Sequence, residues 1–419
     1  MEVFKFGGAS VKDADGIRNL AKIIMLNRDK QLLIVVSAMG KTTNALEALS
    51  SAYSNRESTI YSLFEEVRRC HHDILTDLFK NEDHPVFDEI ANTFIEIEWM
   101  LEDEPHSDSD YIYDQIVSIG ELVSSRIVNA YLNHKGLKSK WLDARGYIMT
   151  DNTYREGSVQ WEKTCRAINN AIPSLLKDNF IVTQGFIGGT SENFTTTLGR
   201  EGSDYSAAVF AACLKADNLT IWKDVPGVLN ADPKIFPDTQ KYIELPYSEA
   251  MEMSYYGATV IHPKTIKPLR NLGIPLYVKP FSNPEESGTV INEDAVTCKT
   301  FPAIIVKNRQ TLASISTKDF SFVTEDHLSE VFRAFASVNM KINMMQVSAL
   351  SLSVCFDADQ EKFKTLLSGL ETTFTIKYNQ DLQLVTIRHY KPETIDTLSS
   401  GKIVLMEQLS RNTAQLVLR

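Results

Sequence analysis

The chain has 419 residues, and its 43 Lys and Arg against 54 Asp and Glu give a net charge of −11. Because 43% of the residues are apolar and 23% are charged, the composition excludes wholesale disorder, collagen-like repeats and coiled-coil filaments. The length indicates two or three domains. The apolar runs, such as residues 32–36, are far shorter than the ~20 residues of a membrane span. With no secretory signal in MEVFKFGGAS, we expect a cytoplasmic protein with no membrane partner.

The negative charge is concentrated in residues 56–110, which hold 16 acidic and 4 basic side chains, a net charge of −12. We interpret this segment as a solvated helical surface, and its acidity argues against a nucleic-acid partner. Five cysteines, an odd number without a CxxC pair, predict free thiols rather than a disulfide framework or a metal site: Cys70, Cys165, Cys213, Cys298 and Cys355.

Strand and helix signals alternate from the first residues. Residues 3–6 predict a strand, two glycines a turn, residues 17–24 a helix face, and residues 32–36 a buried strand. This β-turn-α-β order is typical of a parallel sheet flanked by helices. Residues 56–110 predict an inserted pair of helices with a stop near Pro85.

The α/β pattern resumes at Tyr111, with a helix through residues 119–127 and strands at 180–183, 219–222 and 276–278. Residues 1–295 therefore predict one α/β domain, followed by a boundary. In residues 301–419, short strands and helices indicate small ferredoxin-like α+β modules. Their strands are predicted at 303–306, 312–316, 342–347, 352–356 and 384–387, and their helices at 328–336, 363–370 and 392–399.

The first segment that could carry chemistry is Lys5-Phe6-Gly7-Gly8-Ala9-Ser10, where a strand ends in paired glycines. Glycines let backbone N–H groups approach an anion, and a lysine adds a point charge, so the segment predicts a phosphate cradle. A tight strand–helix connection without a ligand is the alternative.

The second segment, residues 37–44, follows a buried strand and imitates a Walker A loop. Val35 stands where the first glycine of that motif belongs, so we reject a P-loop. Hydroxyl groups at the carboxyl end of a strand still fit a ligand site of an open α/β sheet. A purely structural loop remains the alternative.

The third segment, residues 195–204, carries Arg200 between glycines and leads into a small-residue helix. An arginine can bind a carboxylate bidentately, and Ser203 and Asp204 stand at the helix start. A capped helix after a polar turn is the alternative.

The fourth segment, residues 222–234, joins a strand ending in Lys223 and Asp224 to an Asp-Pro-Lys loop, and we interpret it as the wall of a nucleotide site. Ordinary turn chemistry is the alternative. The eight histidines show no zinc-binding spacing, and His262 before Pro263 is interpreted as a packed or capping residue.

In this order, the four segments resemble the amino-acid kinase family, and within it the aspartate kinases. The resemblance also includes residues 119–121, 182–188 and 256–263, and so covers nearly the whole chain. It implies an α/β three-layer sandwich with a mainly parallel sheet in residues 1–295. It also implies C-terminal tandem ACT modules, one at 312–376 and a shortened one formed by 301–307 with 381–419.

The resemblance also implies roles for individual residues. Lys5 would neutralise charge on the transferred phosphoryl group, and Asp204 would orient Lys5. L-Aspartate would contact Thr43, Glu121, Arg200 and Ser203. ATP, accompanied by Mg²⁺, would contact Lys5, Gly7, Gly8, Ser10, Lys223, Asp224, Leu229 and Lys234.

Elementary chemistry adds that an aspartate β-carboxylate, with a pKa of ~3.9, is already an ionised nucleophile at neutral pH. Phosphoryl transfer then depends on positioning and charge stabilisation, which fits candidate segments rich in Lys, Arg, Gly and Thr.

The implied activity is that of a monofunctional aspartate kinase in the pathway to lysine, threonine and methionine. The length excludes an appended homoserine dehydrogenase, and a kinase for glutamate or N-acetylglutamate is a weaker alternative. A non-catalytic amino-acid sensor is the alternative from another class. It is favoured by Ala9, Glu201 and Thr259, which stand where the family usually has threonine, glycine and lysine.

The ACT modules imply feedback control by an amino-acid effector and a homodimer or higher homo-oligomer. Lysine-sensing relatives carry Asp and a Thr-Ser-Glu run in the effector loop. Here Asn343 and the residues Val347-Ser348-Ala349 occupy those positions, which argues against lysine as the effector.

Overall fold

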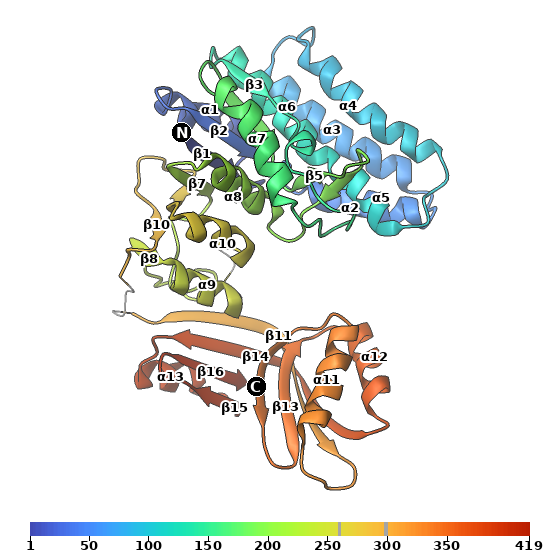
Figure 1. Cartoon of the computed structure of the whole chain (residues 1–419), viewed down its shortest axis with the longest axis vertical. Helices are drawn as coiled ribbons and strands as arrows, with labels where there is room; N and C mark the ends of the chain where they lie inside the picture. The colour runs from blue at the N-terminus through green and yellow to red at the C-terminus, as the bar shows by residue number, and fades with distance from the viewer. Residues whose placement is uncertain (259–260, 297–300) are drawn as a thin grey trace. The chain divides into compact units, whose positions relative to one another are not determined.

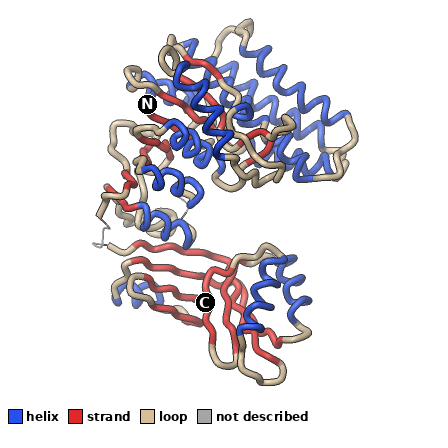
Figure 2. The backbone as a smooth tube through the Cα atoms, viewed as in Figure 1, coloured by secondary structure: helices blue, strands red, loops and turns tan. Residues whose placement is uncertain are grey.

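The computed structural model describes residues 1–258, 261–296 and 301–419 (Figures 1 and 2). The chain divides into two compact units. The first contains Met1–Val228, Lys241–Met251 and Val260–Thr297, and the second contains Leu229–Gln240, Glu252–Thr259 and Cys298–Arg419. The division into a kinase domain and two ACT modules stays a prediction.

The first unit is built on an eight-stranded sheet in the order β3-β4-β2-β1-β7-β9-β10-β8. All neighbours run parallel except β9 and β10. Every residue of β2 is buried, as expected for a parallel strand covered on both faces. The strands are β1 (Glu2–Phe6), β2 (Leu32–Val36), β3 (Ser139–Trp141), β4 (Phe180–Gln184), β7 (Asn218–Lys223), β8 (Glu244–Pro246), β9 (Leu276–Pro280) and β10 (Thr289–Asn292).

Helices cover this sheet to give the three-layer sandwich that was expected (Figure 1). One layer holds α1 (Ala14–Leu26) and α6 (Ile119–His134), and α6 packs against β2, β3 and β4. The other layer holds α7 (Trp161–Leu175), α8 (Gly202–Leu214) and α10 (Pro263–Leu272). Helix α8 packs against β1, β2 and β7, and its small apolar residues let it lie close to the sheet.

Further helices and a hairpin complete the first unit. The pair of helices predicted between residues 56 and 110 is present as α3 (Ile60–Leu78) and α4 (Val86–Glu102). The remaining elements are α2 (Thr42–Ser54), α5 (Ser109–Val117), the 3-10 turn η1 (Ala144–Gly146), β5 (Ile187–Gly189) and β6 (Thr195–Thr197). Helix α9 (Tyr247–Tyr256) begins in the first unit and ends in the second.

The second unit is a six-stranded antiparallel sheet in the order β12-β13-β11-β14-β16-β15. Its strands are β11 (Ala303–Thr317), β12 (Ile342–Val347), β13 (Ser351–Asp357), β14 (Phe374–Arg388), β15 (Val404–Leu409) and β16 (Thr413–Leu418). Its helices are α11 (Glu325–Ser337), α12 (Gln360–Leu370) and α13 (Pro392–Ser399).

The prediction of two separate strands at 303–306 and 312–316 was wrong, because β11 is continuous. The polar stretch between them interrupts the apolar pattern. It stays in the strand because β14 pairs with β11 on both sides of the register shifts between Lys307 and Leu312.

The prediction of five free thiols was also wrong, because Cys165 of α7 and Cys213 of α8 form a disulfide. The two cysteines are 48 residues apart, and they meet because α7 packs beside α8. Neither the number of cysteines nor their spacing reveals that packing. Cys70 is free and exposed, Cys355 is free and buried, and Cys298 lies outside the described residues.

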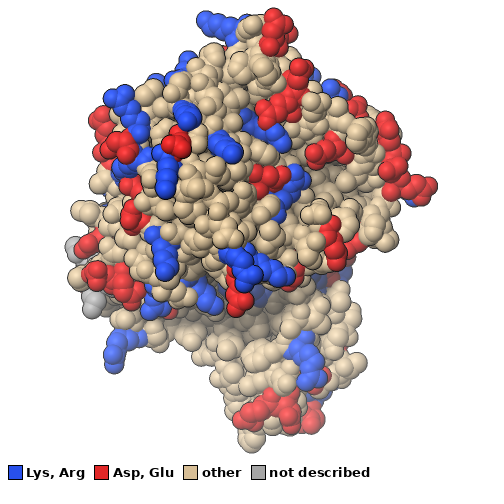
Figure 3. All heavy atoms as spheres, turned by 45° about the horizontal axis from the view of Figure 1, so that its top comes forward, with Lys and Arg blue, Asp and Glu red and all other residues tan. Residues whose placement is uncertain are grey.

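Two surface properties bear on partners. Within residues 1–258, 261–296 and 301–419, no helix is both long enough and apolar enough to cross a bilayer. On the face shown in Figure 3, basic and acidic side chains are interspersed.

The second unit depends on a core in which Phe356 is fully buried between Phe335 and Phe363, with ring centroids 5.2 and 5.5 Å away. We expect Phe356→Ala to cost about 3–5 kcal/mol and to lower the midpoint of the transition that unfolds this unit. Differential scanning calorimetry measures the change. Phe320→Ala, at a side chain that is 85% exposed, is the control and should change little. Equal effects of the two variants would contradict this assignment of the core.

Candidate active site

The centre of the site is a carboxylate between two lysines. Asp204, in the first turn of α8, is fully buried. Its Oδ1 lies 2.6 Å from Lys5 Nζ, and its Oδ2 lies 3.4 Å from Lys223 Nζ. Burial raises the pKa of Asp204, but the charges of Lys223 and Lys5 outweigh this effect and hold the pKa below its ordinary value.

Strand pairing places the two lysines. Strands β1 and β7 are parallel neighbours in which Lys5 is paired with Ile221 and Phe6 with Trp222. Lys5 and Lys223 therefore both lie near the carboxyl ends of adjacent strands, where open α/β sheets bind ligands. One carboxylate between two ammonium groups leaves a net positive charge suited to an anion.

Two loops meet beside this ion-pair cluster. The loop after β1 approaches the loop after β2 so closely that a Cβ on Gly8 would lie 2.7 Å from the carbonyl oxygen of Ala38. The Gly40 N–H donates to the carbonyl of Gly8 at 3.0 Å. Ser10 is buried, and its hydroxyl donates to the carbonyl of Trp222 at 3.4 Å, so it fastens the first loop to β7.

Glu121 brings an incompletely satisfied carboxyl group to the same region. It lies in the first turn of α6, it is 2% exposed, and its Oε1 accepts from Ala38 N at 3.3 Å. Its Oε2 has no hydrogen-bond partner among the described residues. Burial raises the pKa of Glu121 to about 8, against opposing contributions from backbone N–H donors and from the charge of Lys5.

The turn before α8 is unusual in its backbone. Glu201 has a φ of 56°, in the left-handed region that costs a non-glycine residue roughly 1 kcal/mol. The Arg200 side chain beside it is exposed, with no ion pair or hydrogen bond to the described residues. Ser203 follows in the first turn of α8 and is partly buried.

The other predicted residues are distributed as follows. Thr43 is the second residue of α2 and is partly buried, while Asp224 follows β7 and is exposed. Leu229 and Lys234, predicted to contact ATP, belong to the second unit. Thr259, singled out from the sequence, lies outside the described residues.

The family of this chain follows from its similarity to known proteins. The model of the amino acid kinase family matches residues 1–280. The chain belongs to the amino acid kinase family.

Individual members of this family are similar over most of the chain. The lysine-sensitive aspartokinase 3 of Escherichia coli is 28% identical over 392 residues, which are 92% of this chain and 86% of that protein. The chloroplastic aspartokinase 2 of Arabidopsis thaliana is 32% identical over 85% of this chain and 66% of its own length. The chain spans 42% of the bifunctional aspartokinase/homoserine dehydrogenase 2 of the same plant.

A solved structure agrees in fold over the full length of the chain. E. coli aspartokinase III in complex with aspartate and ADP superimposes with a TM-score of 0.85 at 25% identity, covering 100% of this chain and 96% of that one. The same enzyme in complex with lysine and aspartate gives a TM-score of 0.83 at 26% identity.

Sequence reasoning missed Asp114, a fully buried carboxyl group of α5. It accepts hydrogen bonds from Thr197 and from the backbone of Arg155. Burial raises the pKa of Asp114 to about 6, and these hydrogen bonds oppose the rise. Its partners are 41 and 83 residues away in the chain, so the local sequence SDYIYDQIV of α5 does not reveal them.

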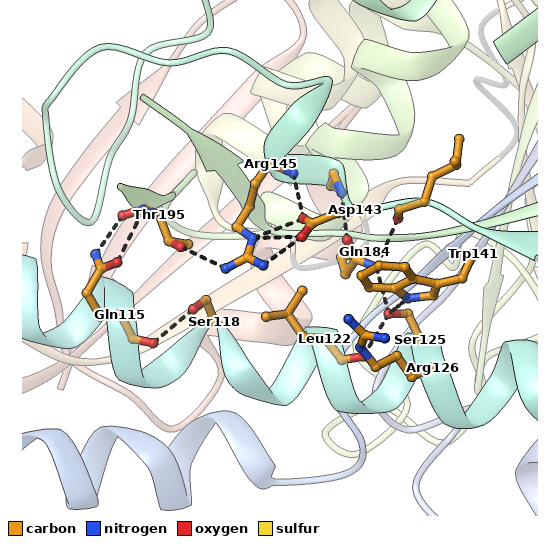
Figure 4. A network of polar contacts seen from close by, with 12 residues as sticks. Gln115, Ser118, Leu122, Ser125, Arg126, Trp141, Asp143, Arg145, Gln184 and Thr195 are labelled. Atoms are coloured by element: carbon orange, nitrogen blue, oxygen red, sulfur yellow. Dashed lines mark hydrogen bonds and ion pairs between the residues drawn. The ribbon is translucent and has the colours of Figure 1, made fainter. Parts of the chain in front are cut away.

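A second network that sequence reasoning missed runs between α5, α6 and the sheet (Figure 4). Gln184 donates to Ser125 at 2.8 Å, and Ser125 accepts from the Trp141 indole at 2.9 Å. Gln115 donates to the carbonyl of Thr195 at 2.9 Å. The first two contacts hold α6 against β4 and β3, and the third holds α5 against β6.

The raised pKa of Glu121 predicts a pH dependence of stability. A carboxyl group whose pKa is about 8 folded and 4.5 unfolded stabilises the fold below pH 4.5, and this stability is lost as the pH rises through 8. The difference corresponds to as much as about 5 kcal/mol. We expect Glu121→Gln, which cannot ionise, to remove this part of the pH dependence. Urea unfolding of both proteins at pH 5 and pH 9 checks it, and identical pH dependence would contradict it.

Proposed function

We propose that this protein is an aspartate kinase. It transfers the γ-phosphoryl group of ATP to the β-carboxylate of L-aspartate and forms 4-phospho-L-aspartate, the first step toward lysine, threonine and methionine. The observation that carries the proposal is the buried Lys5–Asp204–Lys223 cluster near Glu121, whose Oε2 lacks a partner within the described part of the chain. The aspartokinase relatives, and the E. coli structure with aspartate and ADP, support the choice of substrates.

The reaction needs charge stabilisation rather than a base. The β-carboxylate of aspartate is ionised at neutral pH, so it attacks the γ-phosphorus directly while the bond to the β-phosphate oxygen breaks. Negative charge is spread over the phosphoryl oxygens in the transition state. Lys5 and Lys223 lie at adjacent strand ends where both can face that charge, and Asp204 fixes their ammonium groups in place.

The nucleotide would lie along the loop after β1 and the segment after β7. Gly7, Gly8 and Ser10 would bring backbone groups to the phosphates, and Lys223 and Asp224 would contact the rest of ATP. The described residues contain no group of three or more His, Cys, Asp or Glu side chains able to hold a metal ion. Mg²⁺ accompanying the nucleotide would supply charge neutralisation at the phosphates.

The aspartate site would combine opposite charges. Glu121 Oε2 would accept from the α-ammonium group, which satisfies a buried oxygen without a partner in residues 1–258, 261–296 and 301–419. Arg200, exposed and unpaired among the described residues, would bind a carboxylate, with Thr43 and Ser203 as hydrogen-bond donors. Glutamate is longer by one methylene and would misplace one of its ends.

The second unit would be regulatory. We expect tandem ACT modules there, with an amino-acid effector and a homodimer or higher homo-oligomer. Asn343 is engaged within the sheet, since it accepts from Lys307 Nζ at 2.8 Å and donates to Gln310 at 2.9 Å. This engagement supports an effector other than lysine. Inhibition assays with each aspartate-family amino acid decide it.

The direct test is ADP release from Mg·ATP with L-aspartate, glutamate or N-acetylglutamate as the acceptor. We expect turnover with aspartate alone. Lys5→Met should lower kcat by at least about a hundredfold, because the negative charge on the transferred phosphoryl group would lose the ammonium group that stabilises it. The exposed Lys215→Met, at the end of α8, is the control. Folded protein that turns over none of the acceptors would overturn the proposal and favour a non-catalytic sensor.

Glu201 gives a separate prediction about the nucleotide. Its exposed carboxylate lies at the entrance to α8, three residues before Asp204, so it adds negative charge near the proposed phosphates. We expect Glu201→Gln to lower the KM for ATP about two- to threefold at low salt, with the effect weakening as salt rises. Glu162→Gln, an exposed acidic residue of α7, serves as the control. A KM that is unchanged at low salt would show that Glu201 is remote from the nucleotide.

A further inference from the structure

We propose that Asp114 is a positioning residue that sets Arg200 relative to Glu121 and so determines which dicarboxylic amino acid the site accepts. The inference rests on the proposed function, since it takes Arg200 and Glu121 as the groups that bind the two ends of the substrate. Asp114 itself contacts neither the substrate nor the nucleotide in this scheme.

Asp114 binds the strand that leads to Arg200. Its Oδ1 accepts from the Thr197 hydroxyl at 2.7 Å, and its Oδ2 accepts from the Thr197 N–H at 2.9 Å. Thr197 is the last residue of β6, so the chain is held three residues before Arg200. Because Asp114 and Thr197 are both fully buried, water cannot replace these bonds.

The same carboxylate also fixes a second segment against the Arg200 turn. Asp114 Oδ2 accepts from the Arg155 N–H at 2.9 Å. The Arg155 guanidinium lies 4.0 Å from the ring of Tyr113 and forms an ion pair with Asp110 at 2.9 Å. Asp110, Tyr113 and Asp114 have the i, i+3, i+4 spacing of one helix face, so α5 holds this segment with three consecutive contacts.

The segment at Arg155 in turn supports the backbone next to Arg200. A Cβ on Gly199 would lie 3.3 Å from both the Arg155 carbonyl oxygen and Glu156 Cγ, and Gly199 has a φ of 76°. The Gly157 N–H donates to the Thr197 carbonyl at 2.8 Å. The turn that carries Arg200 is therefore bounded on one side by residues that depend on Asp114.

Asp114 is joined to Glu121 through rigid backbone. Helix α5 ends at Val117 and α6 begins at Ile119, and the N–H of Ser118 between them donates to the Asp114 carbonyl at 3.3 Å. Glu121 follows in the first turn of α6. The continuous segment of α5 and α6 thus carries Glu121, which would bind the ammonium end of the substrate. It also positions Arg200, which would bind a carboxylate of the substrate. Their separation would select aspartate over glutamate.

Asp114 acts through acceptor geometry, which an amide can reproduce. An asparagine oxygen can accept from both N–H groups, while its NH₂ donates to the Thr197 hydroxyl. The titratable and charged groups around it are the Arg155 guanidinium and the phenols of Tyr113 and Tyr154. Asp114→Asn should therefore retain the KM for aspartate and the preference for aspartate over glutamate that Asp114→Ala loses.

The test is steady-state kinetics of the full chain with aspartate and glutamate, using Asp114→Ala, Asp114→Asn and Gln115→Ala. For Asp114→Ala we expect the KM for aspartate to rise on the order of tenfold or more and the preference for aspartate over glutamate to narrow, with the KM for ATP within twofold of wild type. Asp114→Asn should stay within about threefold of wild type. Gln115→Ala is the matched control, because Gln115 is the next residue of α5 and holds Thr195 at the other end of β6.

Three outcomes would overturn the inference. In Asp114→Ala, the KM for aspartate could rise no more than the KM for ATP, or the KM for aspartate could stay unchanged. Alternatively, Asp114→Asn could be as impaired as Asp114→Ala. If Asp114→Ala does not fold, Thr197→Val, which removes only the hydroxyl bond, should give a smaller increase confined to aspartate.

Hydrogen exchange of residues 195–203 separates this inference from the proposed function. If the wild-type protein does not phosphorylate aspartate, the proposed function is wrong. Faster exchange in Asp114→Ala, but not in Asp114→Asn, would still support the positioning of this turn, and unchanged exchange would overturn it.

Discussion

The buried ion-pair cluster of Asp204 with Lys5 and Lys223 is the interaction on which the proposed site depends. A buried carboxylate is stable only when its charge is compensated, and here two strands and one helix each contribute a member. Strands β1 and β7 must be adjacent and parallel for the lysines to reach one side chain, and α8 must begin over their carboxyl ends. The cluster therefore links the order of the central sheet to the chemistry.

The division of the chain into units bears on regulation. The segments Leu229–Gln240 and Glu252–Thr259 belong to the unit that holds the antiparallel sheet, and the first of them contains Leu229 and Lys234, which were predicted to contact ATP. Within that unit, the Ile304 N–H donates to the Asn230 carbonyl at 2.7 Å, and Arg388 forms an ion pair with Glu252 at 3.4 Å. Lys341 lies 4.3 Å from the ring of Tyr255. A change in the position of β11, β12 or β14 would therefore act directly on these two segments through these contacts.

The sequence was sufficient for the features that depend on local pattern. Strand β2 begins and ends where its apolar run does, and α13 spans the predicted residues 392–399. His262 accepts from the Lys264 N–H and caps α10, as interpreted from its position before a proline. Lys5 and Asp204 could be grouped through their motifs, although their direct contact is visible only in the fold.

What the sequence could not show depends on packing between distant segments. The Cys165–Cys213 disulfide follows from the side-by-side placement of α7 and α8. The role inferred for Asp114 follows from hydrogen bonds to Thr197 and Arg155, neither of which lies near it in the chain. The raised pKa of Glu121 follows from its burial, since burial disfavours the charged form of a carboxyl group.

Glu121 also shows how such a site can favour its substrate. Among the described residues, no cation forms an ion pair with its buried carboxyl group, and burial raises the pKa of this group to about 8. An ammonium group next to Oε2 would favour the charged form of Glu121. The two groups would form a strong hydrogen bond, because the site has low polarity. Amino-group binding would then be coupled to release of the Glu121 proton. An N-acetylated amino acid has no ammonium group and could not drive that ionisation, so the carboxyl group proposed to bind aspartate would discriminate against it.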